Sequence, residues 1–391
     1  MSKLQNPYRK IVLLGCQYSI SDEDRNEFSS LIPFVKDWHK LYQILTRTQT
    51  DLFFYKNILD AHNKNDVPKF FLEDLKKEYI KNCIRNAQKK HDYEKLKAVL
   101  TSNGITLIPL KGGYLNQFVY KDSGVRPMSD IDVLMQKSDI EKVKKMMLTK
   151  SWQMKVYLFK SKTLERISKN TIHDPYTITT GDTNIELHIG IHNGFQSFNV
   201  NINDYWKRSK TIVENTNLAT YLDKTDFLQH LCLHAYSDMI GSILKLRDFV
   251  DIIAFLKLYS SEVDWKKLYK TSKEYNCLNE IGQVLKICVK YFNIKIDHKI
   301  TGWGETKNIS NVVEMSFLNM FSSNLYSQMF FIKYKIKRRL AYYKKTKNIR
   351  EIIDLTLGFV FPNPSYINDQ FNKQNKSKFT YHYYKLLKLI K

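Results

Sequence analysis

The segment Arg126-Pro127-Met128-Ser129-Asp130-Ile131-Asp132-Val133-Leu134-Met135 decides which fold the sequence predicts. Residues 130–135 are a short segment that ends in three apolar residues, which is typical of a strand. Residues two apart on a strand share a face, so Asp130 and Asp132 lie together while Ile131 faces the core. Two neighbouring carboxylates repel each other unless a cation or protons neutralise them, and their hard oxygen atoms suit Mg²⁺. Taken alone, the pair fits a solvated strand end or a helix cap equally well.

A glycine pair precedes this strand. Residues 105–110 are apolar and β-branched and predict another strand, which ends at Lys111-Gly112-Gly113. Glycines let a backbone approach a ligand closely and expose its N–H groups to phosphate. The short helix expected at 114–120 would direct its positive end to the same place. Adjacent strands would then bring phosphate-binding backbone and metal-binding carboxylates to one edge.

A third acid is expected on a later strand, within Ile185-Glu186-Leu187-His188-Ile189. The three apolar side chains share one face, and Glu186 and His188 share the other. Glu186 is therefore a candidate metal ligand, and an ordinary half-exposed strand is the alternative. His188 either lines the same site or is a satisfied, half-buried histidine.

The flanking regions predict an α+β fold, with a small mixed-sheet core between N-terminal and C-terminal helical regions. We expect helices over 24–100, with residues 31–45 on one apolar face and a break at Val67-Pro68. Strands are expected at 155–160, 176–180 and 184–191, with Ser138 capping a helix after the second core strand. Helices resume at Lys224. The predicted regions are 1–100 helical, 101–200 core, 201–330 helical, and 331–391 basic and aromatic.

Composition limits the class of protein. The 391 residues are 43% hydrophobic and carry a formal net charge of +23. This charge would attract phosphates, nucleic acid or anionic lipid. A composition rich in Lys and Asn explains it equally well. Five scattered cysteines predict reduced thiols in a cytoplasmic protein. The N-terminus lacks a signal-peptide pattern. Only the uncharged segment 315–332 approaches the length of a membrane-spanning helix. We expect a buried helix there, and the alternative is a helix that lies on a membrane surface.

These motifs together resemble the uncharacterised bacterial nucleotidyltransferase family of the polymerase-beta-like nucleotidyltransferase superfamily. The resemblance covers about residues 30–390 and rests on six segments: Leu110-Lys111-Gly112-Gly113, the segment from Arg126 to Leu134, Ile185-Glu186-Leu187-His188, Leu231-Cys232-Leu233-His234, Leu246-Arg247-Asp248 and Phe361-Pro362-Asn363-Pro364-Ser365-Tyr366. The chain differs from the wider superfamily in having Gly113 in place of a serine and Glu186 in place of an aspartate. Ser129 or Lys111 would compensate for the missing hydroxyl.

The resemblance implies a two-ion mechanism that moves an NMP group from an NTP to an acceptor hydroxyl and releases pyrophosphate. In it Asp130 and Asp132 hold Mg²⁺ on the triphosphate, and Asp132 and Glu186 hold a second Mg²⁺ at the acceptor. Lys111 and Arg126 neutralise the phosphates, and Gly112, Gly113 and Ser129 complete the nucleotide-binding set. The choice of NTP stays open. So does the acceptor, although the basic surface favours an anionic one.

Two other classes stay open. A glycosyltransferase also holds a metal with Asp-x-Asp, usually after a longer nucleotide-binding region than this chain has. A non-catalytic binder of nucleic acid or anionic surfaces would use the basic, aromatic C-terminal region. Two later motifs receive no catalytic role: His230 and His234, four apart on a helix, are expected in the core rather than on zinc, and Arg247 and Asp248 are expected to form an ion pair over the cleft.

Overall fold

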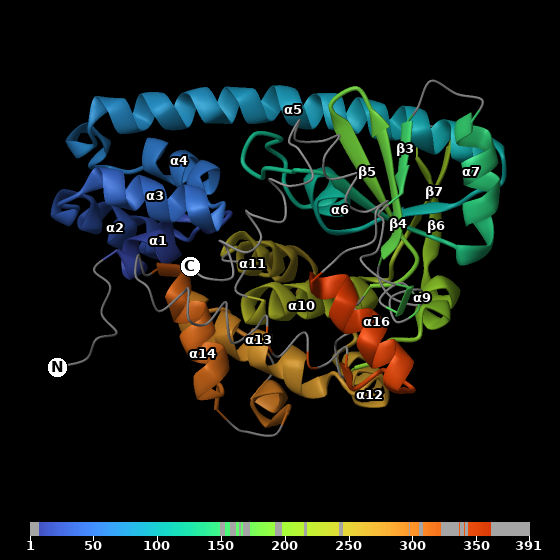
Figure 1. The fold of residues 1–391 in the computed structure, drawn as a ribbon. Helices are drawn as coiled ribbons and strands as arrows, with labels where there is room; N and C mark the ends of the chain where they lie inside the picture. Colours follow the sequence, from blue (N-terminus) through green and yellow to red (C-terminus); the bar gives the residue numbers. More distant parts are fainter. Residues whose placement is uncertain are drawn as a thin grey trace.

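The fold was analysed in a computed structural model of the chain (Figure 1). The structure describes residues 8–148, 153–156, 162–163, 166, 173–191, 198–214, 217–241, 245–296, 298–304, 308–321, 336, 340 and 343–360. Among these residues, no helix has both the length and the apolar character needed to cross a membrane.

The N-terminal helices start earlier than expected, at α1 (Arg9–Gly15), and continue as α2 (Asp22–Leu31), α3 (Trp38–Thr48), α4 (Asp51–Leu59) and α5 (Lys69–Ser102). The prediction of one continuous apolar face over 31–45 was wrong. A 3-10 turn (Ile32–Phe34) containing Pro33 ends α2, and the Asp37 carboxylate accepts a hydrogen bond from Lys40 N–H at 2.9 Å to start α3. The break at Val67-Pro68 is confirmed, because α5 begins directly after it.

The central sheet has the order β1-β2-β5-β4-β3. Its strands are β1 (Leu107–Pro109), β2 (Ile131–Met135), β3 (Gln153–Val156), β4 (His173–Thr180) and β5 (Thr183–His188). Only β2 and β5 are parallel, and the other pairs are antiparallel. The predicted α+β fold with a small mixed sheet is therefore confirmed. The expected strand at 155–160 starts earlier, and its residues 157–160 lie outside the described residues.

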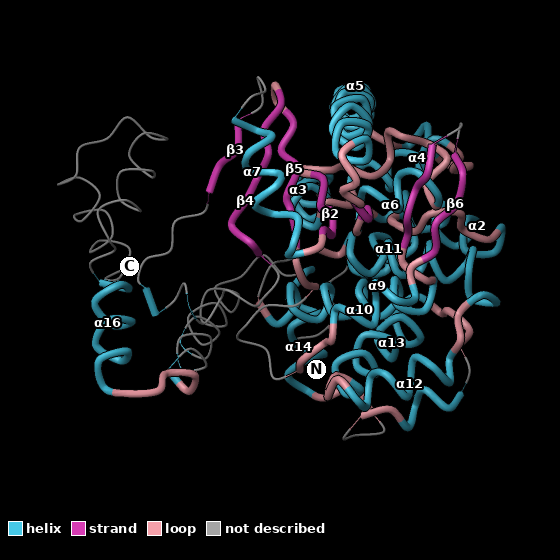
Figure 2. Tube along the Cα trace, turned by 90° about the vertical axis from the view of Figure 1, so that its right-hand side faces the viewer, coloured by secondary structure: helices cyan, strands magenta, loops and turns pink. Residues whose placement is uncertain are grey.

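Helices cover both faces of this sheet. The C-terminal half of α5 and α7 (Ile140–Leu148) share a core with Ile131, Val133, Ile185 and Leu187. Ser138 lies inside a 3-10 turn (Lys137–Asp139) before α7, so its expected place as the N-cap is wrong. Figure 2 views α5 nearly along its axis, beside the strands. On the other face, α6 (Lys111–Phe118) packs against α10 (Lys224–Ile240), with the rings of Tyr114 and Phe227 4.3 Å apart.

The region after the sheet is not wholly helical, which corrects the expectation for 201–330. After α9 (Ile202–Arg208) the chain forms a hairpin, β6 (Lys210–Glu214) with β7 (Asn217–Tyr221), whose alternation of apolar and polar residues is short and largely exposed. The helices that follow are α10, α11 (Arg247–Tyr259), α12 (Trp265–Glu274), α13 (Leu278–Phe292) and α14 (Asn311–Leu318).

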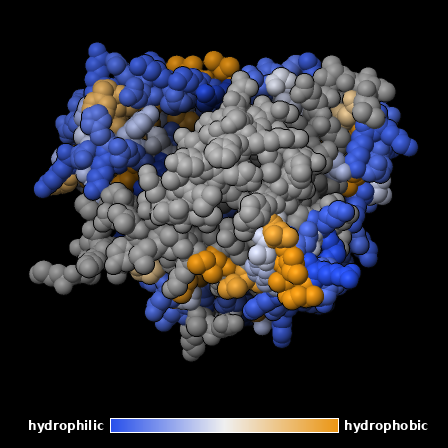
Figure 3. Space-filling model, in the orientation of Figure 1, coloured by the Kyte–Doolittle hydropathy of each residue, from blue (hydrophilic) through white to orange (hydrophobic). Residues whose placement is uncertain are grey.

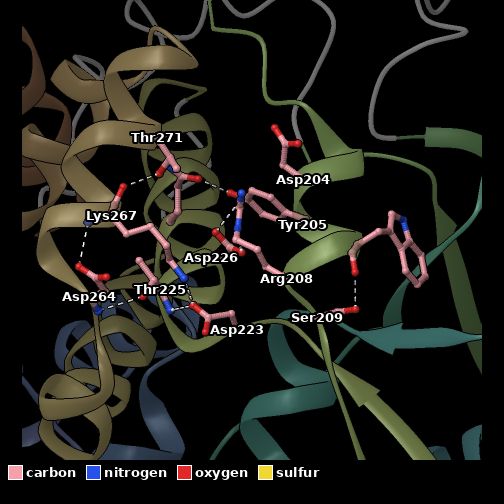
Figure 4. Close-up of polar contacts among 12 residues, drawn as sticks. Asp204, Tyr205, Arg208, Ser209, Asp223, Thr225, Asp226, Asp264, Lys267 and Thr271 are labelled. Atoms are coloured by element: carbon pink, nitrogen blue, oxygen red, sulfur yellow. Dashed lines mark hydrogen bonds and ion pairs between the residues drawn. The ribbon is translucent and has the colours of Figure 1, made fainter.

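Polar contacts join α9 to α10, and α10 to α12 (Figure 4). Arg208 donates two hydrogen bonds, at 2.7 and 2.9 Å, to the carboxylate of Asp226, whose side chain is 1% exposed. Asp223 accepts from Thr225 N–H at the start of α10 and from Lys267 of α12. These ionic contacts hold α9, α10 and α12 as one unit beneath the sheet.

The described C-terminal part ends with α16 (Ile349–Val360). Figure 3 shows apolar side chains gathered over this helix, where Ile349, Ile352, Ile353 and Leu357 are exposed. Within the stretch 315–332, where a buried helix was expected, α14 ends at Leu318 and a 3-10 turn (Asn319–Phe321) follows with Met320 and Phe321 buried. Residues 322–332 and most of the basic region 331–391 lie outside the described residues.

Candidate active site

The parallel pairing of β2 with β5 builds the centre of the site. Its register sets Asp132 beside Glu186 and Leu134 beside His188. Because residues two apart share a face, Asp132, Glu186 and His188 point to the same side of the sheet. Ile131, Val133, Ile185 and Leu187 fill the core on the opposite side.

These three side chains approach one another closely. His188 Nε2 lies 2.7 Å from Asp132 Oδ1 and 3.7 Å from Glu186 Oε2. One ligand atom from each residue lies within 4.8 Å of the others. We call this set the β2–β5 group. Asp132 is 7% exposed and the side chain of Glu186 is 23% exposed, so the group opens to solvent on the Glu186 side.

Charge is distributed unevenly within the β2–β5 group. Burial alone would raise the pKa of Asp132, but Lys111 and His188 outweigh it and hold that pKa well below its usual value. The pKa of Glu186 is raised, first by burial and then by the negative charges of Asp130 and Asp132. Asp132 is thus a permanent carboxylate, whereas Glu186 would gain most from a nearby cation.

Asp130 occupies the flank of this group. It precedes β2, is half-buried, and does not belong to the three residues whose ligand atoms converge. Its charge is nevertheless close enough to raise the pKa values of both Glu186 and Lys111. Of the three predicted acids, Asp132 and Glu186 therefore lie together with His188, and Asp130 lies next to this group.

Lys111 contacts the group from the start of α6. Its Nζ donates to Asp132 Oδ1 at 3.0 Å, and although burial opposes its charge, Asp132 raises its pKa. The backbone of Lys111 has φ +40°, a conformation that residues other than glycine rarely adopt. We expected this ammonium group on a phosphate, and the structure shows it on the carboxylate that is the best candidate metal ligand.

Arg126 was expected to bind phosphate, and the structure places its charge elsewhere. Its Nε and Nη2 donate to the two oxygens of Asp251 in α11 at 2.8 and 2.7 Å, and Tyr120 Oη donates to the same carboxylate at 2.7 Å. The two charged side chains are 4% and 3% exposed. Arg126 therefore fastens the segment before β2 to the helical region from within the core.

The two glycines differ in their surroundings. A Cβ on Gly112 would lie 2.3 Å from Arg126 Nη1, so the lack of a side chain there makes room for the buried guanidinium. A Cβ on Gly113 would meet nothing closer than 3.4 Å. Packing thus accounts for Gly112, and the predicted phosphate contact of both glycines stays a prediction.

Ser129, one residue before Asp130, lines a cavity of about 270 Å³ between the N-terminal helices and α11. Asp51 lies on the wall of the same cavity, and burial, helped by the charge of Glu78, raises its pKa to about 6. Local sequence patterns could not predict this cavity, because its walls come from residues far apart along the chain, among them Gln49, Asp51, Asn82, Arg85 and Arg247.

Two carboxylates side by side on one face of a mixed sheet are the kind of ligand set that enzymes use for metal-assisted transfer. Residues 35–293 match the family described as "Uncharacterised nucleotidyltransferase". The chain belongs to this family, and it is a nucleotidyltransferase. No curated protein and no solved structure matches it. The match extends from α3 through the sheet into α13, so it includes the β2–β5 group.

Proposed function

We propose that the chain transfers an NMP group from an NTP to an acceptor hydroxyl in a Mg²⁺-dependent reaction, as an enzyme of the polymerase-beta-like superfamily. The observation that carries this proposal is the register that places Asp132 beside Glu186, whose side chain is partly exposed, on one side of the sheet. Family membership supports the reaction class, and the oxygen atoms of the two carboxylates are the ligands that Mg²⁺ prefers.

Asp132 and Glu186 would hold the cation, with Asp130 completing the set on the triphosphate side. Mg²⁺ bound there would neutralise charge on the transferring phosphoryl group and on the leaving pyrophosphate. The acceptor oxygen forms a bond to the α-phosphorus, the bond to the bridging α–β oxygen breaks, and the acceptor proton passes to water.

The side chains around Asp132 have orienting roles. His188 and Lys111 both bind its Oδ1, and no described residue forms a hydrogen bond to Oδ2, the oxygen that would bind the cation. Lys111 then supplies a fixed positive charge at the start of α6, where the helix N-terminus also favours phosphate. A cationic side chain in such a position would stabilise the charge that develops in the transition state.

The test uses purified protein with Mg²⁺, each of the four α-labelled NTPs, and a cell extract as the source of acceptor. We expect transfer of label and release of pyrophosphate, and Asp132→Asn should lower the rate by at least about 10²-fold. Asp264→Asn is the matched control, since Asp264 is an exposed cap of α12 and asparagine caps equally well. Transfer by Asp132→Asn within threefold of the unmodified enzyme would refute the assignment, and label transfer without pyrophosphate would refute the reaction class.

A further inference from the structure

A second set of ligand-type side chains lies where α10 meets α11. His234 and Asp238 are one turn apart on α10, and Asp248 lies in the first turn of α11. One ligand atom from each lies within 4.8 Å of the others. His234 Nε2 is 3.7 Å from Asp238 Oδ2 and 3.9 Å from Asp248 Oδ2. We call this set the α10–α11 group.

The side chains of the α10–α11 group do not form hydrogen bonds to one another. Both separations exceed hydrogen-bonding length, so the atoms converge on a common point without bonding directly. Asp248 is 5% exposed, and its Oδ2 has no hydrogen-bond partner within the described part of the chain. Its other oxygen, Oδ1, lies 3.6 Å from Arg247 Nη2. A buried carboxylate oxygen left unbonded is costly, and it needs a reason such as a missing ligand.

Each carboxylate of the group has a neighbouring cation, but among the described residues none forms a hydrogen bond to Asp248 Oδ2. Lys245 Nζ donates to Asp238 Oδ2 at 2.9 Å, much as Lys111 does to Asp132 in the β2–β5 group. Arg247 forms the expected ion pair with Asp248, Nη2 to Oδ1 at 3.6 Å, and donates a hydrogen bond from Nη1 to the Pro127 carbonyl. Two carboxylates, one of them deeply buried, therefore meet an imidazole at a point that a divalent cation would satisfy.

His234 directs Nε2 toward both carboxylates, and an imidazole nitrogen is a common ligand of transition metals. The buried His230 ring lies 6.5 Å from the His234 ring at an interplanar angle of 23°, and neither nitrogen of the His230 ring has a hydrogen-bond partner among the described residues. His230 lies in the core as expected, at 2% exposure, whereas the side chain of His234 is 20% exposed.

The two groups lie within electrostatic range of each other. Asp238 is close enough to Lys111 to raise its pKa, and Lys111 directly contacts Asp132. Lys111 is therefore near both groups.

We propose that His234, Asp238 and Asp248 bind a divalent transition-metal ion of the Mn²⁺ or Zn²⁺ class. One imidazole with two carboxylates is a ligand set for such ions, whereas Mg²⁺ prefers oxygen ligands alone. The ion would add positive charge on the helical side of the site, apart from any cation held by the β2–β5 group. This proposal rests on the ligand geometry and does not depend on nucleotidyl transfer.

The test is Mn²⁺ binding, measured by electron paramagnetic resonance on metal-stripped full-length protein without nucleotide. Asp132→Asn serves as the background, because it weakens the β2–β5 group and leaves the other intact. We expect this variant to keep a Mn²⁺ site with nitrogen coupling from an imidazole. Adding Asp248→Asn should weaken binding at least tenfold, and adding His234→Gln should remove the coupling.

A second ligand variant and a control variant complete the test. Asp238→Asn alters a more accessible ligand, 13% exposed, and is expected to lower affinity at least tenfold even if Asp248→Asn does not fold. Asp264→Asn, the exposed cap of α12, should leave Mn²⁺ affinity unchanged. Loss of all Mn²⁺ binding in Asp132→Asn alone, or affinity within twofold after folded Asp238→Asn or Asp248→Asn is added, would overturn the proposal. Transfer activity is not the readout, so failure of the proposed function would not affect the outcome.

Discussion

The buried pair between Arg126 and Asp251 permits a direct test of what Arg126 does. Both side chains are almost fully buried and joined by two short hydrogen bonds. Removing one partner leaves an uncompensated charge in the core, which costs about 3–5 kcal/mol. We expect that loss for Asp251→Asn, which strands the guanidinium, and for Arg126→Met, which strands the carboxylate.

The double variant Arg126→Met/Asp251→Asn should be more stable than either single variant, by at least about 2 kcal/mol, because no buried charge remains. The asparagine oxygen can still accept the hydrogen bond from Tyr120. An entropy of about 2.1 cal/mol/K per residue over 391 residues makes a loss of 3–5 kcal/mol equivalent to a fall in Tm of about 4–6 °C.

The assays are urea unfolding of all four proteins and NTP affinity of the double variant. Single variants that lose less than about 1 kcal/mol, or a double variant less stable than both, would refute the argument that the pair is structural. If Arg126 instead bound phosphate, the double variant would be stable yet would bind NTP at least tenfold more weakly. We expect its affinity to stay within threefold.

Three further predictions concern stability and pH. Gly112→Ala should cost about 1–3 kcal/mol in thermal unfolding because its Cβ would meet Arg126 Nη1 at 2.3 Å; Gly113→Ala, with 3.4 Å of clearance, is the control, and equal losses would contradict the packing argument. The pKa of Asp51 is raised to about 6, so the folded chain binds a proton at this carboxylate more tightly than the unfolded chain does. The contribution of Asp51 to the free energy of unfolding therefore falls as pH rises from 4 to 7. Asp51→Asn should therefore gain about 1–2 kcal/mol relative to the unmodified chain between pH 4 and 7.5, and a pH-independent difference in urea midpoints would count against it. Arg208→Met should lose about 3–5 kcal/mol by stranding the buried Asp226, with Arg208→Lys intermediate because lysine lacks the two-pronged geometry; a chemical denaturation series in which lysine equals arginine would contradict this.

Local pattern predicted the strand that carries Asp132 and the shared face of Glu186 and His188, because the two-residue repeat of a strand depends on neighbouring residues alone. It could not predict that Asp132 would lie beside Glu186, since register is set by pairing between distant segments. The same limit explains Arg126. Its motif suggested a phosphate ligand, but its partner Asp251 lies 125 residues away in a helix with no matching signal.

The hairpin β6–β7 was missed for a different reason. Its strands are five residues each and lie within a region of strong helical periodicity, so a short exposed alternation carried little weight. Asp238 was missed as a possible ligand because its four-residue spacing from His234 is also the spacing of an ordinary helix surface pair. Its significance depends on Asp248, which only the packing of α10 against α11 brings near.

Lys111 is the residue at which backbone and charge conflict. At φ +40° a glycine would be the natural choice, and a lysine there costs on the order of 1–3 kcal/mol of strain. A glycine, however, has no ammonium group to reach Asp132, and burying that carboxylate without a cation would cost more than the strain. The strained backbone is therefore the less costly of two alternatives as long as Asp132 must stay charged and buried. Folding alone does not require a carboxylate at that position, since Leu134, two residues along the same strand face, is fully buried and apolar. The combination of a strained lysine with a buried aspartate is what a binding site requires and what a purely structural strand would avoid.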